Sequence, residues 1–361
     1  MTRSPDGAEE TCDELTAQDT QDAAAAALHD AHRLRNGLVW TVALVLLIVA
    51  AGLAVPGLHG VVKRAAHADI AWLAAGVGLE ILSCLGYVLT VRLVLNQGPP
   101  REVRRLAWAE MAFGAVVPLG GAGSLAVGAW AMRAWDISWS RIVDRSAVIF
   151  LLTSAVNVIV LALAGLGLAA GVGGTNLSVL YGVVPAVIGV GCIAFFALLP
   201  RIPALRSPSG SGRITRILVR ASGWVQATEF VGRERDWRLV GTIGYLLFDM
   251  AVLWACLRAV GRSVPLLPLS LGYQIGYLAN LVPIPGGVGA LEGGIVGALV
   301  LYGFPAAPTA AAVVLYHAIA LWIPTIGGTV SFALIRRAVA AGPPSALVNK
   351  ASPSAPGNGR V

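Results

Sequence analysis

The stretch VPIPGGVGALEGG at residues 282–294 decides how this chain folds. It lies within one of the most apolar parts of the sequence, yet it holds two prolines, five glycines and one glutamate. Proline removes a backbone donor and glycine weakens a helix, so a helix entering this stretch is predicted to break there. The break leaves backbone N–H and C=O groups that need partners, and the rest of the sequence indicates what surrounds them.

The composition identifies that surrounding as a lipid bilayer. Of the 361 residues, 57% are hydrophobic and only 12% are charged, whereas soluble domains have about 25% charged residues. These values, with a mean hydropathy of +0.75, predict an all-α polytopic membrane protein. In lipid, irregular backbone survives only where protein or a water-filled cavity covers it. The broken stretch is therefore expected to face the interior of a helix bundle.

The charges and the cysteines argue against several classes of function. The formal net charge is +7, but the basic residues lie in loops between apolar segments, as the preference of Lys and Arg for the inner side of a membrane predicts. No nucleic-acid partner is therefore expected. The four cysteines form no CxxC pair, and the sequence has no metal-binding or phosphate-cradling motif and no nucleophile–base constellation. We expect no catalytic residue, no metal site and no cofactor.

Apolar segments follow one another along the chain, at about residues 38–55, 70–95, 106–130, 146–170, 179–199, 238–260, 266–282, 285–303 and 308–335. About 20 apolar residues span a bilayer, so most of these segments are long enough to cross. Both ends of the chain are poor in large apolar side chains. We predict disordered cytoplasmic tails at 1–36 and 339–361, and one membrane domain at 37–338 between them.

Arginine clusters decide which segments cross, because loops on the inner side of a membrane are enriched in Lys and Arg. Such clusters precede the first segment, follow the second, occur in 131–145 and 200–237, and follow the last segment. Two inside loops then flank 106–130, so this segment is predicted to enter from the cytoplasm and turn back. By the same counting of crossings, the loops on both sides of 266–303 lie outside. This segment is therefore predicted to enter from the outside and return there. We therefore expect about six full spans, two re-entrant helical hairpins and both termini in the cytoplasm.

The two hairpins also resemble each other in sequence. VVPLGGAGSLAVG at 116–128 aligns with LVPIPGGVGALEGG at 281–294 once one residue is inserted. We divide the membrane domain into half one at 70–170 and half two at 238–335, in opposite orientations, joined by an amphipathic cytoplasmic linker at 200–237. Inverted repeats with broken helices are typical of secondary transporters. Two alternatives stay open: the glycines serve only close helix packing, and the linker helix, expected at 213–230, is only a connector.

Several ionisable residues lie at membrane depth, where they are energetically costly and usually face a cavity or a partner. They are Glu80, Glu110, Asp249, Glu292 and His317. Glu292 follows the broken stretch, so it is predicted either to cap the half-helix that begins near Gly289 or to take part in ion coupling. His317 is predicted either to relay protons or to be a hydrogen-bonded interior residue. Glu110 and Arg133 are expected near the inner interface, where they are either solvated or reach towards water with their charged ends.

The PIPGGVGALEGG stretch resembles the Pro-Gly-Gly-x-Gly-x-x-Glu signature of the transmembrane flippase domain of lysylphosphatidylglycerol synthases. The resemblance continues through LVLYGFPAAPTAAAVVLYHAIALWIPTIGG and covers roughly residues 38–338. It implies a gate for lipid headgroups made by both hairpins, and a half-helix N-terminus there would attract a lipid phosphate. The gate residues that the resemblance implies are Pro118, Gly120, Gly121, Gly123 and Arg133 in the first hairpin and Pro283, Pro285, Gly286, Gly287, Gly289 and Glu292 in the second.

These observations lead to one expectation and two alternatives. We expect a lipid flippase in a bacterial plasma membrane, not an enzyme, that moves a phospholipid, an aminoacylated lipid or a lipid-linked glycan between leaflets. The first alternative is a membrane partner, without transport activity, of a lipid-modifying enzyme or glycosyltransferase. The second is a protein related to phosphatidylglycerol lysyltransferases, although the chain ends soon after its last apolar segment, without the soluble transferase domain of those synthases. The sequence leaves the lipid, the energy source and the oligomeric state open.

Overall fold

The computed structural model describes residues 61, 63–96, 98–116, 121–172, 178–202, 213–279 and 290–340. The apolar segment expected at 38–55, the N-terminal tail, nearly all of the C-terminal tail and the Pro-Gly-Gly turn of the second hairpin lie outside these residues. The chain divides into two units, Met1–Val62 and Lys63–Val361, and all the helices described below belong to the second unit.

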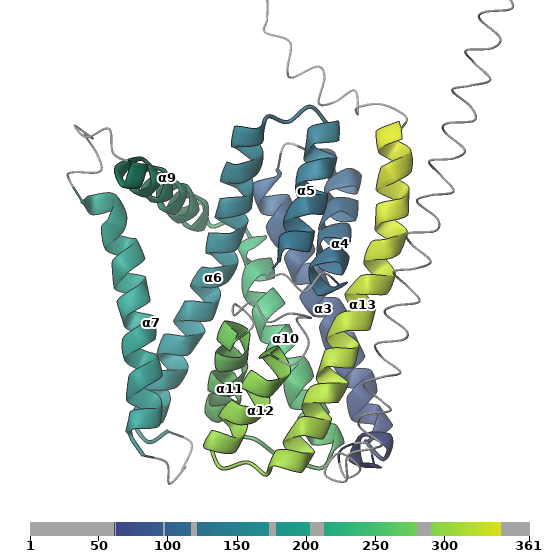
Figure 1. Ribbon diagram of the computed structural model, residues 1–361, viewed down its shortest axis with the longest axis vertical. Coiled ribbons are helices and arrows are strands. Elements are labelled where there is room, and N and C mark those ends of the chain that lie inside the picture. The colour runs from purple at the N-terminus through teal and green to yellow at the C-terminus, as the bar shows by residue number, and fades with distance from the viewer. Residues whose placement is uncertain are drawn as a thin grey trace, which may run out of the picture. The chain divides into compact units, whose positions relative to one another are not determined.

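The described residues form helices and contain no strand. In chain order the elements are α3 (Ile70–Val94), α4 (Pro100–Val116), α5 (Ala122–Ala134), α6 (Trp139–Ala169), α7 (Leu180–Leu198), the 3₁₀ helix η1 (Leu199–Arg201), α9 (Arg213–Arg233), α10 (Leu239–Ala259), α11 (Leu266–Ala279), α12 (Ala290–Leu301) and α13 (Ala306–Ala340). A series of long, short, short and long helices occurs twice, in α3 to α6 and again in α10 to α13 (Figure 1). Between the two series lie α7, η1 and α9.

Within the described residues, five helical segments are long and apolar enough to cross a membrane: α3, α6, α7 with η1, α10 and α13. They coincide with expected full spans, and the remaining expected span, 38–55, lies outside the described residues. The prediction of an all-α polytopic membrane protein is therefore confirmed. The most apolar windows of these segments are only 17–44% buried, and large apolar side chains such as Phe150 and Val187 are exposed. Lipid tails accommodate such a surface, because they are as apolar as these side chains.

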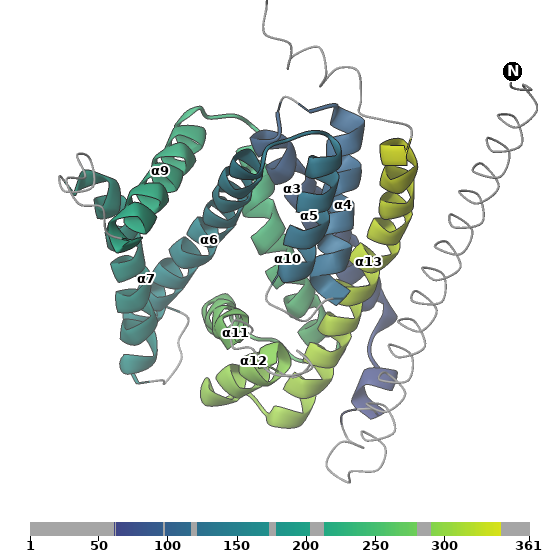
Figure 2. The same cartoon turned by 45° about the horizontal axis from the view of Figure 1, so that its top comes forward.

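The other helices of the two series are shorter than a typical membrane span. The helices α4 and α5 have 17 and 13 residues, and α11 and α12 have 14 and 12. At about 1.5 Å per residue they reach roughly 18–26 Å, less than the ~30 Å of a hydrocarbon core. Because α4 packs against α5 and α11 against α12, each pair forms a helical hairpin. Figures 1 and 2 show the hairpins at opposite ends of the central helices α3, α10 and α13, while re-entry into a membrane and inverted symmetry stay predictions.

The packing centres on the antiparallel pair of α3 and α10. The backbone N–H of Asp69, just before α3, donates to the carbonyl of Ala259 at the end of α10 (2.9 Å). Further along, Gly86 and Gly241 bring the two backbones together: a Cβ built on Gly86 would lie 2.6 Å from the Gly241 carbonyl oxygen. Small residues allow such a close approach between membrane helices. The pair therefore fixes the positions of the polar residues that α3 and α10 hold between them.

The linker helix expected at 213–230 is present as α9, which packs against α6 and η1. The indole N–H of Trp224 on α9 donates a hydrogen bond to Asp144 on α6 (2.9 Å). Apolar side chains form a stripe along α9, in which Val225 is buried and Ile217 is 60% exposed. One part of the stripe therefore packs on protein and another part is open, and contact of the open part with the inner leaflet stays a prediction.

Candidate functional site

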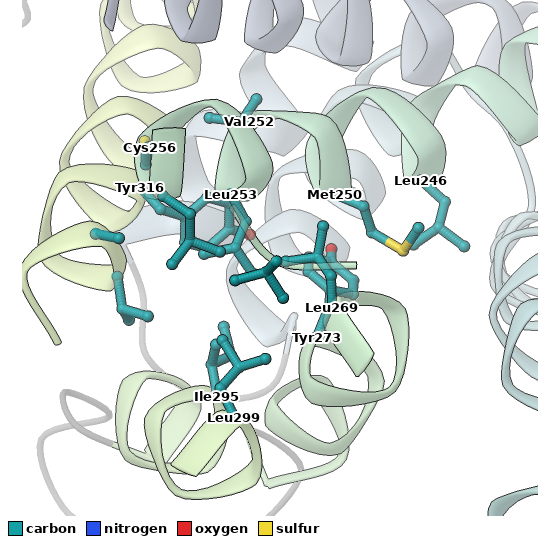
Figure 3. Close-up of a cluster of buried hydrophobic side chains, with 14 residues drawn as sticks. Leu246, Met250, Val252, Leu253, Cys256, Leu269, Tyr273, Ile295, Leu299 and Tyr316 are labelled. Carbon is teal, nitrogen blue, oxygen red and sulfur yellow. The ribbon is translucent and has the colours of Figure 1, made fainter. Parts of the chain in front are cut away.

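Polar side chains from α10, α11 and α13 meet around Asp249. The carboxylate of Asp249, on α10, accepts hydrogen bonds from the hydroxyl of Tyr316 on α13, with O–O distances of 3.0 and 3.2 Å. It also accepts one from the hydroxyl of Tyr273 on α11. Figure 3 shows both tyrosines among the apolar side chains of the surrounding cluster, which include Leu253 and Ile295. Donors from two different helices thus hold one carboxylate inside the bundle.

Glu80 on α3 interacts electrostatically with Asp249 and is itself only 5% exposed. Its Oε1 accepts a weak hydrogen bond from the Cys84 thiol at 3.6 Å, and its Oε2 is buried without a hydrogen-bond partner. Among the described residues, neither Glu80 nor Asp249 forms a salt bridge. No group of three or more His, Cys, Asp or Glu side chains within the described ranges is placed to hold a metal ion.

A second polar contact joins the second hairpin to α13. The Oε1 atom of Glu292, in the first turn of α12, lies 2.6 Å from the Nδ1 atom of His317. The side chains of Glu292 and His317 are 20% and 39% exposed, so neither is fully buried. A carboxylate in the first turn of a helix is also favoured by the helix dipole. The geometry is compatible with both roles expected for Glu292, capping and coupling, and it gives His317 a carboxylate partner.

The residues expected to form the gate are described only in part. Those outside the described residues are Pro118, Gly120, Pro283, Pro285, Gly286, Gly287 and Gly289. Gly121 caps the start of α5 with a φ of 84°, a left-handed conformation that favours glycine, and Gly123 is buried in the first turn of α5. Arg133, at the other end of α5, donates to the carbonyl of Ile137 (3.0 Å) and lies over the Trp139 ring. Arg133 therefore contacts both the loop that follows α5 and the start of α6.

Glu110 is buried, so the prediction that it contacts water near the interface is wrong. Its side chain, on α4, is 6% exposed and accepts a hydrogen bond from the Tyr87 hydroxyl on α3 (3.1 Å). Helix packing explains the burial, because α5 presents Gly128 to the Glu110 carboxyl and has no side chain there to keep the helices apart. The sequence contained one signal that α3 has a polar face towards Glu110: Glu80, Cys84 and Tyr87 follow the i, i+4, i+7 spacing of one helix face.

Three arginines of α4, which belong to the arginine cluster that follows the second apolar segment, line a cavity between α4 and α13, here called the arginine cavity. Its volume is about 380 Å³, and its lining comprises Arg101, Arg104, Arg105, Trp108 and Ser331. The four residues of α4 follow the i, i+3, i+4, i+7 spacing of one helix face, a signal that sequence reasoning could have used. Arg105 pairs with Glu102 at 2.8 Å, whereas Arg101 and Arg104 form no salt bridge within the described residues.

Comparison with known proteins gives this architecture a family context. The sequence profile of the family described as "Lysylphosphatidylglycerol synthase TM region" matches residues 38–328, which is most of the chain. The chain is also similar to a protein named "UPF0104 membrane protein" from Methanothermobacter thermautotrophicus, with 35% identity over 91 residues. That alignment spans 25% of this chain and 26% of the relative, and the relative's name states a membrane protein without an activity.

Proposed function

This chain belongs to the family of the lysylphosphatidylglycerol synthase transmembrane region, and we propose that it moves lipid headgroups between the leaflets of a bacterial plasma membrane. The cargo is a phospholipid, an aminoacylated lipid or a lipid-linked glycan. The protein acts as a flippase and not as an enzyme, with both termini in the cytoplasm. The main support is the polar interior that two short helical hairpins and the α3–α10 pair build around ionisable residues. Such residues at membrane depth usually mark a substrate or ion path.

Hairpins that enter the membrane from opposite sides suit this task. Helices of 12–17 residues are shorter than the usual span of about 20, so we expect each hairpin to leave the membrane on the side where it entered. Irregular backbone at the tips needs cover by protein or by a water-filled cavity, and a headgroup that crosses the membrane needs the same cover. Transporters with inverted repeats and broken helices bind their substrates near the midplane. The two hairpins would offer one half of such a path to each leaflet.

The arginine cavity favours an anionic headgroup. Three guanidinium groups, an indole and a hydroxyl line it, and guanidinium groups bind phosphate through paired, charge-assisted hydrogen bonds. Its volume of about 380 Å³ is large enough for a small-molecule site, for which about 300–1,000 Å³ is usual. Basic pockets between helices on the cytoplasmic side of membrane proteins bind acidic lipid headgroups. We propose that a lipid phosphate enters from the inner leaflet here.

Translocation is measured with the purified full-length protein in liposomes, using fluorescent analogues of anionic, aminoacylated and glycosylated lipids and a membrane-impermeant quencher. The double variant Arg101→Gln, Arg104→Gln should slow movement of anionic lipids tenfold or more, because each arginine near the surface attracts them by about 1 kcal/mol. The matched control is Arg141→Gln, which removes an exposed arginine of α6 outside the cavity. Movement no faster than in protein-free liposomes for every lipid refutes translocation. Equal rates for the double variant and the control refute the role of the cavity.

A second candidate function rests on a different cavity. It has a volume of about 640 Å³, lies between η1 and α9, and is lined by residues that include Ser222, Gly223 and Gln226. In this alternative, the cavity receives a segment of a lipid-modifying enzyme or glycosyltransferase, and the chain itself moves no lipid. Gly223→Trp tests it, because no atom lies within 4 Å of a Cβ built there and the new side chain blocks the cavity without clashing at its base. Loss of lipid modification in cells with Gly223→Trp, but not with Glu292→Gln, favours the partner role, and the reverse favours translocation.

A further inference from the structure

The hydrogen bonds around Asp249 indicate its charge. Tyr273 and Tyr316 both direct their hydroxyls at this carboxylate, and each phenol has one proton to donate. An ionised carboxylate only accepts hydrogen bonds, and such charge-assisted bonds are about twice as strong as neutral ones. The two donors therefore fit an ionised Asp249.

The surroundings of Glu80, in contrast, do not favour an ionised carboxylate. This side chain is 5% exposed, a thiol 3.6 Å away is the donor to its Oε1, and its Oε2 is buried without a hydrogen-bond partner. A second ionised carboxylate beside Asp249 would be both desolvated and repelled. A protonated Glu80 avoids both costs, because its O–H can donate to the neighbouring carboxylate. The pair therefore holds one proton, on Glu80.

No basic side chain among the described residues compensates the pair. The groups that interact with Asp249 are Glu80 and Cys84 from α3, Tyr245 from α10, Tyr273 and Tyr277 from α11, and Tyr316 from α13. The fourth helix packed against α10 is α6, which has no ionisable side chain between Arg145 and its end at Ala169. His317, next to Tyr316 on α13, pairs with Glu292 instead. With one proton bound, the pair of carboxyl groups therefore carries one negative charge, and with two protons bound it is neutral.

A line of phenols leads from this acid pair towards both hairpins. The rings of Tyr245 and Tyr87 have their centroids 5.3 Å apart, and the Tyr87 hydroxyl donates to Glu110 on the first hairpin. Tyr273 also stacks on Tyr277 with centroids 6.4 Å apart, and Tyr277, on α11, is 42% exposed. Side chains with exchangeable protons therefore lie between the acid pair and the first hairpin, and on α11 of the second hairpin.

We propose that Glu80 and Asp249 form a proton-binding site that alternates between one and two protons, and that the second proton releases the second hairpin. Protonation makes Asp249 a weaker acceptor for Tyr273 on α11 and Tyr316 on α13, so the bonds that tie both helices to α10 weaken together. The step transfers a proton and makes or breaks no other covalent bond. Coupling of this step to lipid movement rests on the proposed function, whereas the site itself does not.

Infrared difference spectroscopy of the purified full-length protein tests the site, because it records the C=O stretch of protonated carboxyl groups as pH is changed. Glu80→Gln should remove a band that the wild type has at neutral pH. Glu229→Gln changes a carboxyl of α9 that pairs with Arg233, and as the matched control it should leave this band unchanged. The same band in Glu80→Gln overturns the proposal. Loss of the wild-type band on adding sodium chloride at constant pH also overturns it, because a cation would then compete for the site.

Thermal unfolding provides a second measurement in case a variant folds poorly. Glu80→Gln replaces a protonated acid by a neutral amide of similar shape, so its Tm should stay close to that of the wild type. Asp249→Asn removes the charged acceptor of two phenols, so its Tm should fall further. The opposite order of Tm values overturns the assignment of the proton to Glu80.

Lipid movement in liposomes with and without an imposed pH gradient tests the coupling. We expect the gradient to accelerate translocation by the wild type several-fold and to leave Glu80→Gln unaffected. Equal wild-type rates with and without the gradient overturn the coupling. If no lipid moves under any condition, the proposed function fails, and the infrared result decides the proton site by itself.

Discussion

A methyl group added at Gly86 should force the two central helices apart. A Cβ at this position would lie 2.6 Å from the Gly241 carbonyl oxygen and 2.7 Å from the backbone nitrogen of Tyr245, whereas ordinary contacts begin at 3.4 Å. Both contacts are with backbone atoms, which cannot rotate away as the end of a flexible side chain can. The helices α3 and α10 must therefore separate at this point by several tenths of an ångström, which would also stretch the hydrogen bond between Thr90 and Thr242 (3.0 Å).

The size of the effect follows from two opposing contributions. Overpacking a core by a methylene costs about 1–3 kcal/mol, and replacing Gly by Ala within a helix gains up to about 1 kcal/mol. Gly78→Ala on the same helix isolates the packing cost, because no atom lies within 4 Å of a Cβ built there. We expect Gly86→Ala to be about 1–3 kcal/mol less stable than Gly78→Ala.

Unfolding by sodium dodecyl sulfate in mixed micelles measures the free energy of both variants. The same preparations, placed in liposomes, report whether translocation changes, because α3 and α10 also carry Glu80 and Asp249. Equal stability of Gly86→Ala and Gly78→Ala would contradict this prediction, since the close contact at Gly86 would then be absent or easily relieved.

Tyr316→Phe removes one of the two donors to Asp249 and should lower the unfolding free energy by about 1.5–3 kcal/mol. Tyr302→Phe, which loses a bond to a neutral carbonyl, should cost less, and equal losses would contradict an ionised acceptor. Glu292→Gln should change the unfolding free energy by less than about 1 kcal/mol, because the contact between Glu292 and His317 is partly exposed; a larger loss in the same titration would argue against this. The pKa of Asp236 is lowered by hydrogen bonds from Arg238, so its contribution to stability is present at neutral pH and is lost as pH falls below about 4. The stability difference between the wild type and Asp236→Asn should therefore disappear in acid, and its persistence there would be inconsistent with this contribution. Cysteines placed at the exposed positions Ser138 and Ser263, in a cysteine-free background, should react with an impermeant reagent from the cytoplasm and from the outside, respectively. Labelling of both from one side would rule out opposed hairpins.

The candidate site could be recognised in the sequence only in part. Glu80 and Asp249 were identified because ionisable residues at membrane depth are rare. The phenol that Tyr273 contributes was missed, since a tyrosine in an apolar helix is not unusual by composition. The burial of Glu110 was not predicted. Arginines in the flanking loops locate α4 near the cytoplasm, but they do not reveal that Gly128 lets α5 pack over the Glu110 carboxyl.

The class of protein, the family, the positions of the five long apolar segments that the structure describes, and the two pairs of short helices could all be predicted from the sequence. A bilayer imposes apolarity and length on each segment separately, so these features can be read without knowledge of the packing. Which polar side chains face each other, as Glu80 faces Asp249, becomes visible only when the helices are packed. That outcome depends on the rotation of each helix and on close approaches such as the one at Gly86, and hydropathy contains no information on either.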